Sequence, residues 1–542
     1  MGPDRSAELD RLAGEEFDVV IVGGGITGAG CALDAVSRGL RTALVERADF
    51  ASGTSSRSSK LVHGGVRYLE QKEFGLVREA LAERQIALRN APHLVRVLPF
   101  LIPILTRDGL IDRRIARFLG GVLWMYDLSG GLRIKKAHQR VTRDEALARV
   151  PTLRTDELAS GYLYYDAQAY DARLTLAIAL TAADLGAVVV NYAPAVGITK
   201  NASGRAAGVR VTADGRDIEI RARVVVNAAG VWADDVRALD EGAHPTTMRP
   251  AKGVHITVPW SRVRNEIAMF VPNPVDGRSV FVVPWGAITY VGTTDDDYEG
   301  DIDDPQCTAA DVTYLLDVVN RALVDPLTEA DVIGTWAGLR PLLADDDEKT
   351  ADLSRRHGIR VSGAGVVTVT GGKLTTYRAM ARDTIDQVDQ VLDGKHRRCH
   401  TKHLPLTGAR GYRAPSPDAA PLDVHLAGRY GTEAGAVRAL VTADPTLGEP
   451  LVPGLAYLKA EAVYAVRTER ARTLDDVLDR RTRCRMLDRA ATAEAAESVA
   501  RLLAPELGWD DATTAASVSA YRAELEHERA ASGPPVSTTP AT

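Results

Sequence analysis

Three glycines with fixed spacing are the first residues in this chain whose types and positions could do chemistry. Gly23, Gly25 and Gly28 stand in the stretch GGGITG, which fits the pattern G-x-G-x-x-G. The first glycine permits a tight turn, the second lets the backbone approach a pyrophosphate, and the third allows close packing of a helix on a strand. The free N–H groups of the following helix would then face the phosphates. The stretch therefore predicts a site for the ADP half of a dinucleotide.

The segments on either side of this turn are those that a dinucleotide site requires. Residues 17–22, FDVVIV, predict a buried strand, a helix follows as far as Arg38, and residues 42–46, TALVE, predict a second parallel strand. Glu46 ends that second strand, where a carboxylate accepts hydrogen bonds from ribose hydroxyls. Because an acidic residue here suits NAD and FAD equally, the motif alone leaves both cofactors open.

A second segment, residues 53–70, is dense in small hydroxyl residues and glycines: GTSSRSSKLVHGGVRYLE. Such a loop can bring backbone close to a planar ring and offers many donors to phosphate. On composition alone, a flexible serine-rich surface loop is the alternative interpretation.

Size and composition limit the remaining choices. The chain has 542 residues, enough for two or three domains, and its formal net charge of -6 gives no general attraction for nucleic acid. Its four cysteines are scattered without a CxxC pair, which favours a reducing cytosol over a disulfide framework. The polar N-terminus lacks the apolar core of a signal peptide, and no apolar run is long enough to span a bilayer.

The order of the predicted segments indicates an interrupted domain. Nucleotide-type strand–helix patterns occur at the start, near residue 225 and near residue 370, with mixed β segments between them. The pattern is mostly helical from about residue 405. We therefore expect an α/β fold in which a Rossmann-like domain is interrupted by a mixed α+β substrate domain and followed by a helical C-terminal domain.

Six ordered blocks give the chain a family resemblance. They are SSKLVHGGVRYLE (58–70), VVVNAAGVWAD (224–234), AKGVHITVP (251–259), YVGTTD (290–295), AGLRPL (337–342) and TGGKLTTYR (370–378). With these blocks the chain resembles the FAD-dependent glycerol-3-phosphate dehydrogenases, the respiratory enzymes of glycerol catabolism. The helical tail, including ERARTLDDVLDRRTR (469–483), is similar to the C-terminal domain of this family.

The resemblance implies a domain division, an activity and a set of partners. The expected domains are a discontinuous FAD-binding domain (15–95, 160–235 and 345–390), a substrate domain (96–159 and 236–344), a helical domain (400–530) and a disordered tail (531–542). The implied reaction oxidises sn-glycerol 3-phosphate to dihydroxyacetone phosphate by hydride transfer to FAD, with electrons passing to a membrane quinone. The alternatives are a glycerol-3-phosphate oxidase that uses oxygen, an amine or amino-acid oxidase on the same fold, and a flavin-binding protein without catalysis.

The resemblance also assigns cofactor contacts. Beyond the glycine turn and Glu46, the expected FAD-binding residues are Thr54, Ser59, Lys60, Leu61, Gly230, Gly372, Lys373, Leu374 and Thr375. The stretch Gly371–Thr376 resembles a second glycine turn before a helix, whose backbone amides can stabilise negative charge on a reduced flavin.

The substrate is a phosphate dianion, for which arginine supplies a planar fork that stays charged. By resemblance, Arg67, Tyr68, Arg340 and Lys373 line the substrate pocket, although a single arginine is more often part of a surface ion pair. Removal of the hydroxyl proton requires a base with a pKa near neutrality. His255 in KGVHITV is the best candidate, and His63 is the alternative.

Three further features have other interpretations. His396, Cys399, His400 and His403 have zinc-ligand types, but no second pair completes a site and we expect no metal. Seven arginines between residues 467 and 485 predict mostly a solvated helix face with a secondary role at anionic lipid. Residues 96–105 and 115–126 are the stronger candidates for membrane contact, with core packing as their alternative. We expect a cytoplasmic protein, peripheral on the cytoplasmic face of the membrane, and a homodimer is a further candidate assembly.

Overall fold

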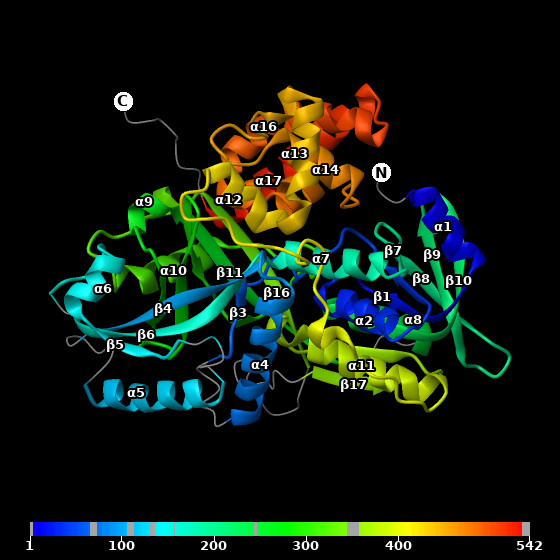
Figure 1. Cartoon of the computed structure of the whole chain (residues 1–542), viewed down its shortest axis with the longest axis horizontal. Coiled ribbons are helices and arrows are strands. Elements are labelled where there is room, and N and C mark those ends of the chain that lie inside the picture. Colours follow the sequence, from blue (N-terminus) through cyan, green and yellow to red (C-terminus); the bar gives the residue numbers. More distant parts are fainter. Residues whose placement is uncertain are drawn as a thin grey trace.

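Two β-sheets and a layer of C-terminal helices make up the protein. The computed structural model describes residues 4–65, 73–105, 113–130, 134, 136–156, 158–242, 246–343 and 357–533. Figure 1 shows the first sheet with its helices at the right, the second sheet at the left, and the C-terminal helices above both. The predicted fold class is confirmed: a Rossmann-like domain, a mixed second domain and a helical C-terminal domain.

The first sheet has eight strands, in the order β17-β18-β10-β1-β2-β7, with β9 pairing with β10 and β8 with β9. Its central strands are parallel, because β1 pairs in parallel with both β2 and β10. The strands are β1 (Glu16–Val22), β2 (Thr42–Val45), β7 (Val188–Val190), β8 (Ala195–Lys200), β9 (Ala206–Ala213), β10 (Arg216–Asn227), β17 (His357–Val361) and β18 (Val367–Gly371). The strands predicted at residues 17–22, 42–46, 205–226 and 366–370 are all present.

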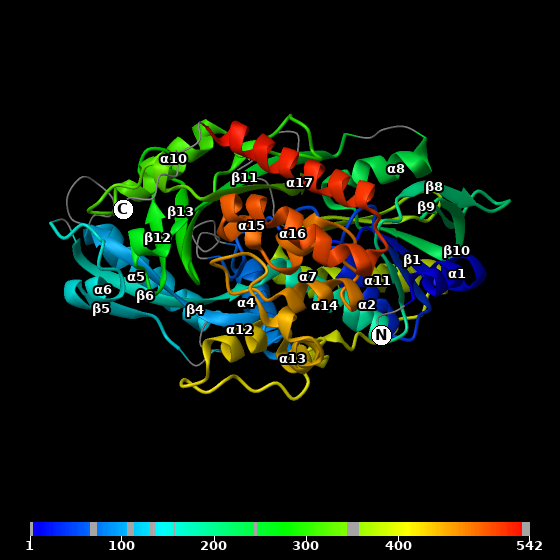
Figure 2. The same cartoon turned by 90° about the horizontal axis from the view of Figure 1, so that it is seen from above.

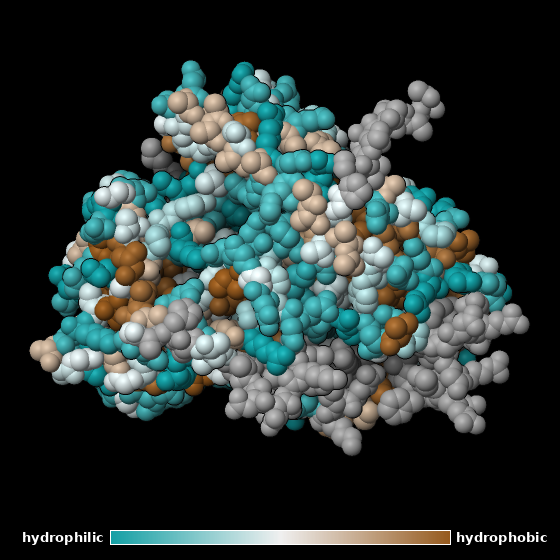
Figure 3. Space-filling view, turned by 180° about the vertical axis from the view of Figure 1, so that it is seen from behind, coloured by the Kyte–Doolittle hydropathy of each residue, from teal (hydrophilic) through white to brown (hydrophobic). Residues whose placement is uncertain are grey.

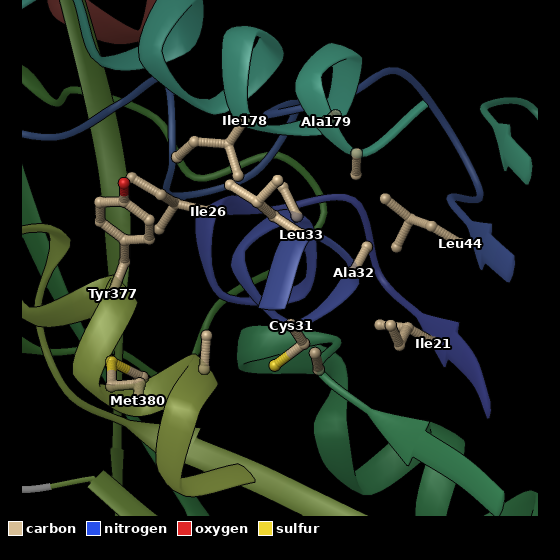
Figure 4. Packing of buried hydrophobic residues seen from close by; sticks show 14 of the residues in the cluster. Ile21, Ile26, Cys31, Ala32, Leu33, Leu44, Ile178, Ala179, Tyr377 and Met380 are labelled. Carbon is tan, nitrogen blue, oxygen red and sulfur yellow. The ribbon is translucent and has the colours of Figure 1, made fainter. Parts of the chain in front are cut away.

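Helix α2 (Ile26–Ser37) begins directly at the glycine turn and is buried on several sides. Figure 4 shows its side chains between α7 (Asp171–Asp184), which carries Ile178, and α11 (Tyr377–Leu392), which carries Met380. Cys31 and Leu33 of α2 belong to the same cluster of buried residues. This all-round burial fixes the position of the helix N-terminus relative to the sheet.

The second sheet has ten strands, in the order β15-β11-β14-β13-β12-β4-β6-β3, with β16 added at β11 and β5 at β6. The strands are β3 (Leu61–Val62), β4 (Val95–Leu105), β5 (Gln139–Thr142), β6 (Leu158–Ala169), β11 (Met248–Pro259), β12 (Ala268–Pro272), β13 (Ser279–Trp285), β14 (Ile288–Gly292), β15 (Asp296–Asp297) and β16 (Gly334–Leu343). Helices α4 (Phe74–Asn90), α5 (Arg113–Leu128), α6 (Arg143–Arg149) and α10 (Ala309–Asn320) accompany this sheet.

Two expectations about this region differ from the structure. Strand β6 pairs with β4 along its length and so belongs to the second sheet, whereas the expected boundary placed residues from 160 onward in the FAD-binding domain. Because β6 is followed directly by α7 in the sequence, the sequence pattern did not indicate that β6 pairs with β4. Residues 96–105 are strand β4, with buried side chains at Phe100 and Ile102. Their proposed membrane contact is therefore wrong, because these side chains pack in the core.

The C-terminal helices cover the junction of the two sheets, as Figure 2 shows from above. They are α12 (Pro421–Tyr430), α13 (Ala434–Ala443), α14 (Lys459–Arg467), the π-helical turn η8 (Asp476–Arg481), α15 (Cys484–Leu487), α16 (Arg489–Leu507) and α17 (Asp511–Ser532). The prediction that most arginines at 467–485 form a solvated face is wrong. Arg481 bonds to the buried Asp49 at 2.5 and 2.9 Å, and Arg483 pairs with the buried Asp171, so these cations join the helices to the first domain.

No helix in the described ranges combines the length and the apolar character needed to cross a membrane. The face seen in Figure 3 is mainly hydrophilic, and its hydrophobic residues form separate patches.

Candidate active site

The glycine turn has the geometry that its sequence predicts. Gly23 has a φ of +111°, and a Cβ atom there would lie 2.6 Å from the Ala228 carbonyl oxygen. A Cβ at Gly28 would lie 1.8 Å from the Gly23 carbonyl oxygen, so only glycine lets α2 pack this closely on the turn. Gly25 caps α2, and the backbone N–H of Ile26, the first residue of the helix, donates to the Ser55 hydroxyl at 2.9 Å. These contacts explain the role of each glycine in the motif.

Glu46 lies at the end of β2 and closes one side of this turn. Its carboxylate accepts hydrogen bonds from the Gly24 N–H at 2.6 Å and from the Ala48 N–H at 2.9 Å. Burial raises the pKa of Glu46, and the two backbone donors oppose that rise. A carboxylate has further lone pairs, so it can still accept hydrogen bonds from the hydroxyls of a ribose.

A cavity of about 550 Å³ runs from this turn to the second sheet. Its volume lies in the range of small-molecule sites. Most of the predicted residues line it: Gly23, Gly25, Glu46, Thr54, Ser59, Leu61, Gly230, His255, Arg340, Gly372, Lys373, Leu374 and Thr375. The alternative base, His63, also lines the cavity. The structure thus brings together residues from five distant parts of the sequence.

Two described residues among those predicted, Gly28 and Lys60, are not part of this lining. Gly28 contacts the turn from behind, as described above. The ammonium group of Lys60 is buried away from the cavity, 3.2 Å from the carboxylate of Asp171. Arg67 and Tyr68 lie outside the described residues.

His255 reaches the cavity from β11 and is 2% exposed. Its Nε2 lies 2.9 Å from the Ser59 hydroxyl, and its ring stacks on Trp336 of the paired strand β16 with centroids 4.6 Å apart and planes at 8°. Its buried Nδ1 has no hydrogen-bond partner among the described residues. Burial lowers the pKa of His255 well below its ordinary value, and the nearby charges of Lys60 and Arg340 lower it further. The ring is therefore neutral at physiological pH.

Two glycines make room for the functional side chains of this sheet. A Cβ atom at Gly292, which pairs with His255, would lie 2.1 Å from the Cδ2 of that histidine. A Cβ at Gly253 would lie 2.6 Å from Nη2 of Arg340. Arg340 itself donates to the Asp295 carboxylate at 2.8 Å and to the Thr294 carbonyl at 3.1 Å, which fixes the direction of its guanidinium group.

The turn after β18 supplies the far end of the cavity. Gly371 and Gly372 have φ values of +74° and +81°, which glycine adopts without strain. Lys373 precedes the short helix η4 (Leu374–Thr376), and the Thr375 hydroxyl lies 3.1 Å from the backbone nitrogen of His63. This turn therefore holds the loop that carries His63 beside the cavity.

Arg57 and Trp336 are the residues that sequence reasoning missed. Arg57 lines both the main cavity and a cavity of about 80 Å³ beneath the C-terminal helices. Its guanidinium group has no hydrogen bond or ion pair with any described residue, and burial lowers its pKa, with the charge of Arg485 acting in the same direction. The position of Arg57 in the stretch GTSSRSSKL, among residues predicted to contact the cofactor, could have indicated that it lines the site.

The predicted cluster of histidines and Cys399 has other contacts in the structure. The Cys399 sulfur lies 3.2 Å from the Thr401 hydroxyl and 3.6 Å from the Arg378 guanidinium. His396 lies 3.7 Å from the Asp386 carboxylate at an exposed position. The segment thus makes side-chain hydrogen bonds through Cys399 and a surface pair through His396.

Comparison with known proteins places this geometry in a family. Residues 18–378 match the family model described as FAD dependent oxidoreductase, and residues 399–514 match the C-terminal domain of alpha-glycerophosphate oxidase. The chain is 42% identical over 541 residues to glycerol-3-phosphate dehydrogenase 2 of Mycobacterium tuberculosis, covering 97% of this chain and 91% of that protein. It is 37% identical to the mitochondrial glycerol-3-phosphate dehydrogenase of Homo sapiens, covering 94% of this chain and 73% of that protein.

A solved structure agrees. The glycerol-3-phosphate dehydrogenase from Bacillus halodurans, complexed with FAD, superposes with a TM-score of 0.78 at 32% identity and covers 98% of this chain and 99% of that chain. The fold and the cavity are thus those of an FAD-dependent oxidoreductase. The chain belongs to the family of FAD-dependent glycerol-3-phosphate dehydrogenases. The predicted family and the predicted cofactor class are confirmed.

Proposed function

We propose that this protein oxidises sn-glycerol 3-phosphate to dihydroxyacetone phosphate with bound FAD and passes the electrons to a membrane quinone. The observation that carries the proposal is the meeting of Arg340 and a neutral His255 in the cavity that begins at the glycine turn. A fixed cation and a neutral base are the two groups that oxidation of a phosphorylated alcohol requires.

The described residues fit FAD. The backbone at Gly23 leaves no room for a Cβ, and a Cβ at Gly25 would lie 3.2 Å from the Ser55 hydroxyl oxygen, close to the N-terminus of α2 where a pyrophosphate would lie. Glu46 would hold the ribose, and the turn from Gly372 to Thr375 would face the flavin ring. When bound, FAD supplies a two-electron acceptor for the hydride of the substrate.

The substrate phosphate would be held by cations that line the cavity. Arg340 is oriented by Asp295 and Thr294, so its guanidinium group loses little freedom on binding. Lys373 and Arg57 line the same cavity and add positive charge. Arg67 and Tyr68 stay predicted members of this set, on the strength of the family resemblance alone.

His255 would take the proton of the substrate C2 hydroxyl as the hydride leaves the C2 carbon. Its Nε2 lies 2.9 Å from the hydroxyl of Ser59, which lines the cavity, so in the tautomer that carries its hydrogen on the buried Nδ1 the Nε2 lone pair would accept this proton. The low pKa of His255 keeps this lone pair available across the neutral range. Loss of a proton from oxygen and a hydride from carbon converts the secondary alcohol into a ketone.

Delivery to a quinone requires contact with a membrane, and α5 is the segment that best suits this contact. Trp124 and Leu128 at its C-terminal end are 58% and 72% exposed. Figure 1 places α5 on the side of the molecule opposite to the C-terminal helices. Exposed apolar side chains on a helix of basic and apolar residues favour an interfacial position on anionic lipid. We therefore propose a peripheral protein on the cytoplasmic face; a homodimer stays a prediction that sedimentation would measure.

A second candidate function is oxidation of the same substrate by oxygen. This candidate is supported by residues 399–514, which match the C-terminal domain of alpha-glycerophosphate oxidase. The two functions differ in the fate of the electrons and share the reaction at C2.

One assay separates these functions. Purified, flavin-loaded protein receives sn-glycerol 3-phosphate in air, with and without a soluble quinone analogue, and dihydroxyacetone phosphate and peroxide are measured. We expect ketone formation that depends on the quinone, with little peroxide. Stoichiometric peroxide without quinone would make the protein an oxidase, and activity only with glycine or another amino acid would refute both candidates.

A further inference from the structure

The side of His255 that faces away from the cavity is covered by a stack of charged and aromatic groups. Trp336 lies flat against the imidazole, with centroids 4.6 Å apart. The ammonium group of Lys60 lies over the Trp336 indole, 4.4 Å from its centroid. The Trp336 indole therefore contacts both the imidazole of His255 and the ammonium group of Lys60.

The ammonium end of this stack is held by the C-terminal helical domain. Lys60 Nζ bonds to Asp171 Oδ2 and to the Ser56 carbonyl, each at 3.2 Å. The other oxygen of Asp171 accepts a hydrogen bond from Arg483, which stands between η8 and α15. All of these groups are buried. Docking of the C-terminal helices thus completes the ion pair that fixes Lys60.

The loop that carries Lys60 is held on three sides. The Trp336 indole N–H donates to the Ser58 carbonyl at 3.3 Å, the Tyr290 hydroxyl donates to the Ser59 carbonyl at 2.9 Å, and the Ala169 N–H donates to the Lys60 carbonyl at 2.8 Å. Lys60 has a φ of +55°, a conformation that costs about 1 kcal/mol in a residue other than glycine. The same loop presents the Ser59 hydroxyl to His255.

We propose that Lys60 and Trp336 are positioning residues for His255, held in place by Asp171 and by Arg483 of the C-terminal domain. The indole fixes the plane of the imidazole, and the ammonium charge behind the indole opposes protonation of the ring. The proposal rests on the role of His255 as the base, and it adds a part for the C-terminal domain in the reaction at C2.

The charges around the stack support this assignment. Those facing His255 are Lys60 and Arg340, and those facing Lys60 are Asp171 and Arg483. Burial lowers the pKa of Lys60 to about 7; Asp171 opposes this effect and Arg483 reinforces it. As the pH falls through 7, Lys60 takes up a proton, and its charge then disfavours a second proton on His255. His255 therefore stays neutral to lower pH than it would alone.

Replacement of Lys60 tests the proposal. Lys60→Met keeps the length of the side chain and leaves Asp171 paired with Arg483, so the fold should survive. We expect the limiting rate of flavin reduction by sn-glycerol 3-phosphate, measured by rapid anaerobic mixing, to fall about tenfold at the lowest pH at which the protein stays folded, and less at pH 8. Lys60→Arg should recover most of the loss, and Trp336→Leu should show the loss at both pH values.

The pKa of His255 gives a readout that does not depend on turnover. Histidine-specific ¹³C labelling, with His255→Asn to assign the signal, should show a pKa about one pH unit higher in Lys60→Met than in the wild type, as expected for removal of one nearby charge. Arg483→Met should change the same signal.

A matched control separates positioning from stability. Glu469 also joins the C-terminal domain to the first domain, through a buried pair with Arg173 at 2.6 Å, but among the described residues it makes no hydrogen bond or ion pair with Lys60, Trp336 or His255. Glu469→Gln should lower the melting temperature and leave the His255 signal and its pH profile unchanged. An unchanged His255 pKa and an unchanged rate profile in folded, flavin-loaded Lys60→Met would overturn the proposal. Failure of the wild-type flavin to be reduced would instead refute the proposed function.

Discussion

Two groups of arginines differ in what surrounds them: those that line the cavity, and those that lie between the C-terminal helices and the first domain. Arg340 lines the cavity with a side chain that is 22% exposed, and its contacts leave it beside open space. Arg481 is 2% exposed and is held by both oxygens of Asp49, with two further bonds to the Glu469 carbonyl. A cation that lines a cavity can serve a ligand, whereas a cation enclosed by its partners serves the fold. The comparison predicts that mutations in the first group affect turnover and those in the second affect stability.

The largest effect on turnover should come from Arg340→Met. If Arg340 holds the substrate phosphate as proposed, loss of its fixed guanidinium group should lower kcat/KM by about 1000-fold, which corresponds to about 4 kcal/mol. KM should rise and kcat should fall together, and FAD should stay bound. Steady-state kinetics and the visible spectrum of the purified variant provide the measurement. Loss of flavin with little change in kcat/KM per bound flavin would show that Arg340 holds the cofactor instead.

Arg481→Met, a substitution in the second group, should lower the stability of the protein. Removal of one partner from a buried pair leaves the Asp49 carboxylate without its main counter-charge, and the free energy of unfolding should fall by about 3 kcal/mol. Denaturant unfolding with flavin fluorescence would measure this loss, and KM should be unchanged. A large change in KM without loss of stability would contradict the division into two groups.

The same pair gives a pH dependence of stability. Burial raises the pKa of Asp49, but the charges of Arg481 and Arg480 outweigh it, so the net pKa is lowered. The pair therefore contributes stability above the ordinary carboxyl pKa, and this contribution is lost as the pH falls through the lowered value. Asp49→Asn should remove this part of the acid dependence.

Gly292→Ala tests the positioning of His255 without touching a charge. The added Cβ would lie 2.1 Å from the imidazole, so the ring must shift from its place beside Ser59. We expect the limiting rate of flavin reduction to fall by about 10- to 100-fold, since misplacement by about 1 Å has this effect on catalysis. A rapid-mixing experiment would measure the rate, and an unchanged value would show that the position of His255 is not critical.

The smallest effect should come from Arg467→Ala. This arginine belongs to the same stretch as Arg481 but is 51% exposed, and it pairs with Glu506 at the surface. The change in unfolding free energy should stay below about 1 kcal/mol, with turnover unaffected. A loss as large as that of Arg481→Met would show that exposure does not distinguish the two groups.

The sequence predicted local features better than long-range pairing. The glycine turn follows from spacing alone, because each glycine is required by contacts within one strand–turn–helix unit. The burial of Arg481 and Arg483 was not predicted, because their partners Asp49 and Asp171 lie more than three hundred residues away in the sequence. Acidic residues interleaved with the arginines in the same stretch indicated a solvated helix instead. The stack of Lys60 on Trp336 depends on the pairing of β11 with β16 and on the path of the loop before β3, neither of which a periodicity reveals.

The family resemblance supplied what spacing could not. It directed attention to Arg340 and His255, which lie 85 positions apart in the sequence and meet only because both strands belong to one sheet. It also assigned Lys60 to the cofactor, whereas the structure places its ammonium group behind Trp336. Motif context led to residues that line one cavity, but it did not give the direction of each side chain.

The measurement that tests the central claim most directly is anaerobic reduction of the bound flavin. Purified protein is titrated with sn-glycerol 3-phosphate without oxygen, and the visible flavin absorbance is recorded, with glycine and the opposite enantiomer as comparison compounds. We expect full bleaching by sn-glycerol 3-phosphate alone, with one dihydroxyacetone phosphate formed for each flavin. Flavin that stays oxidised, or that is bleached only by the amino acid, would contradict it.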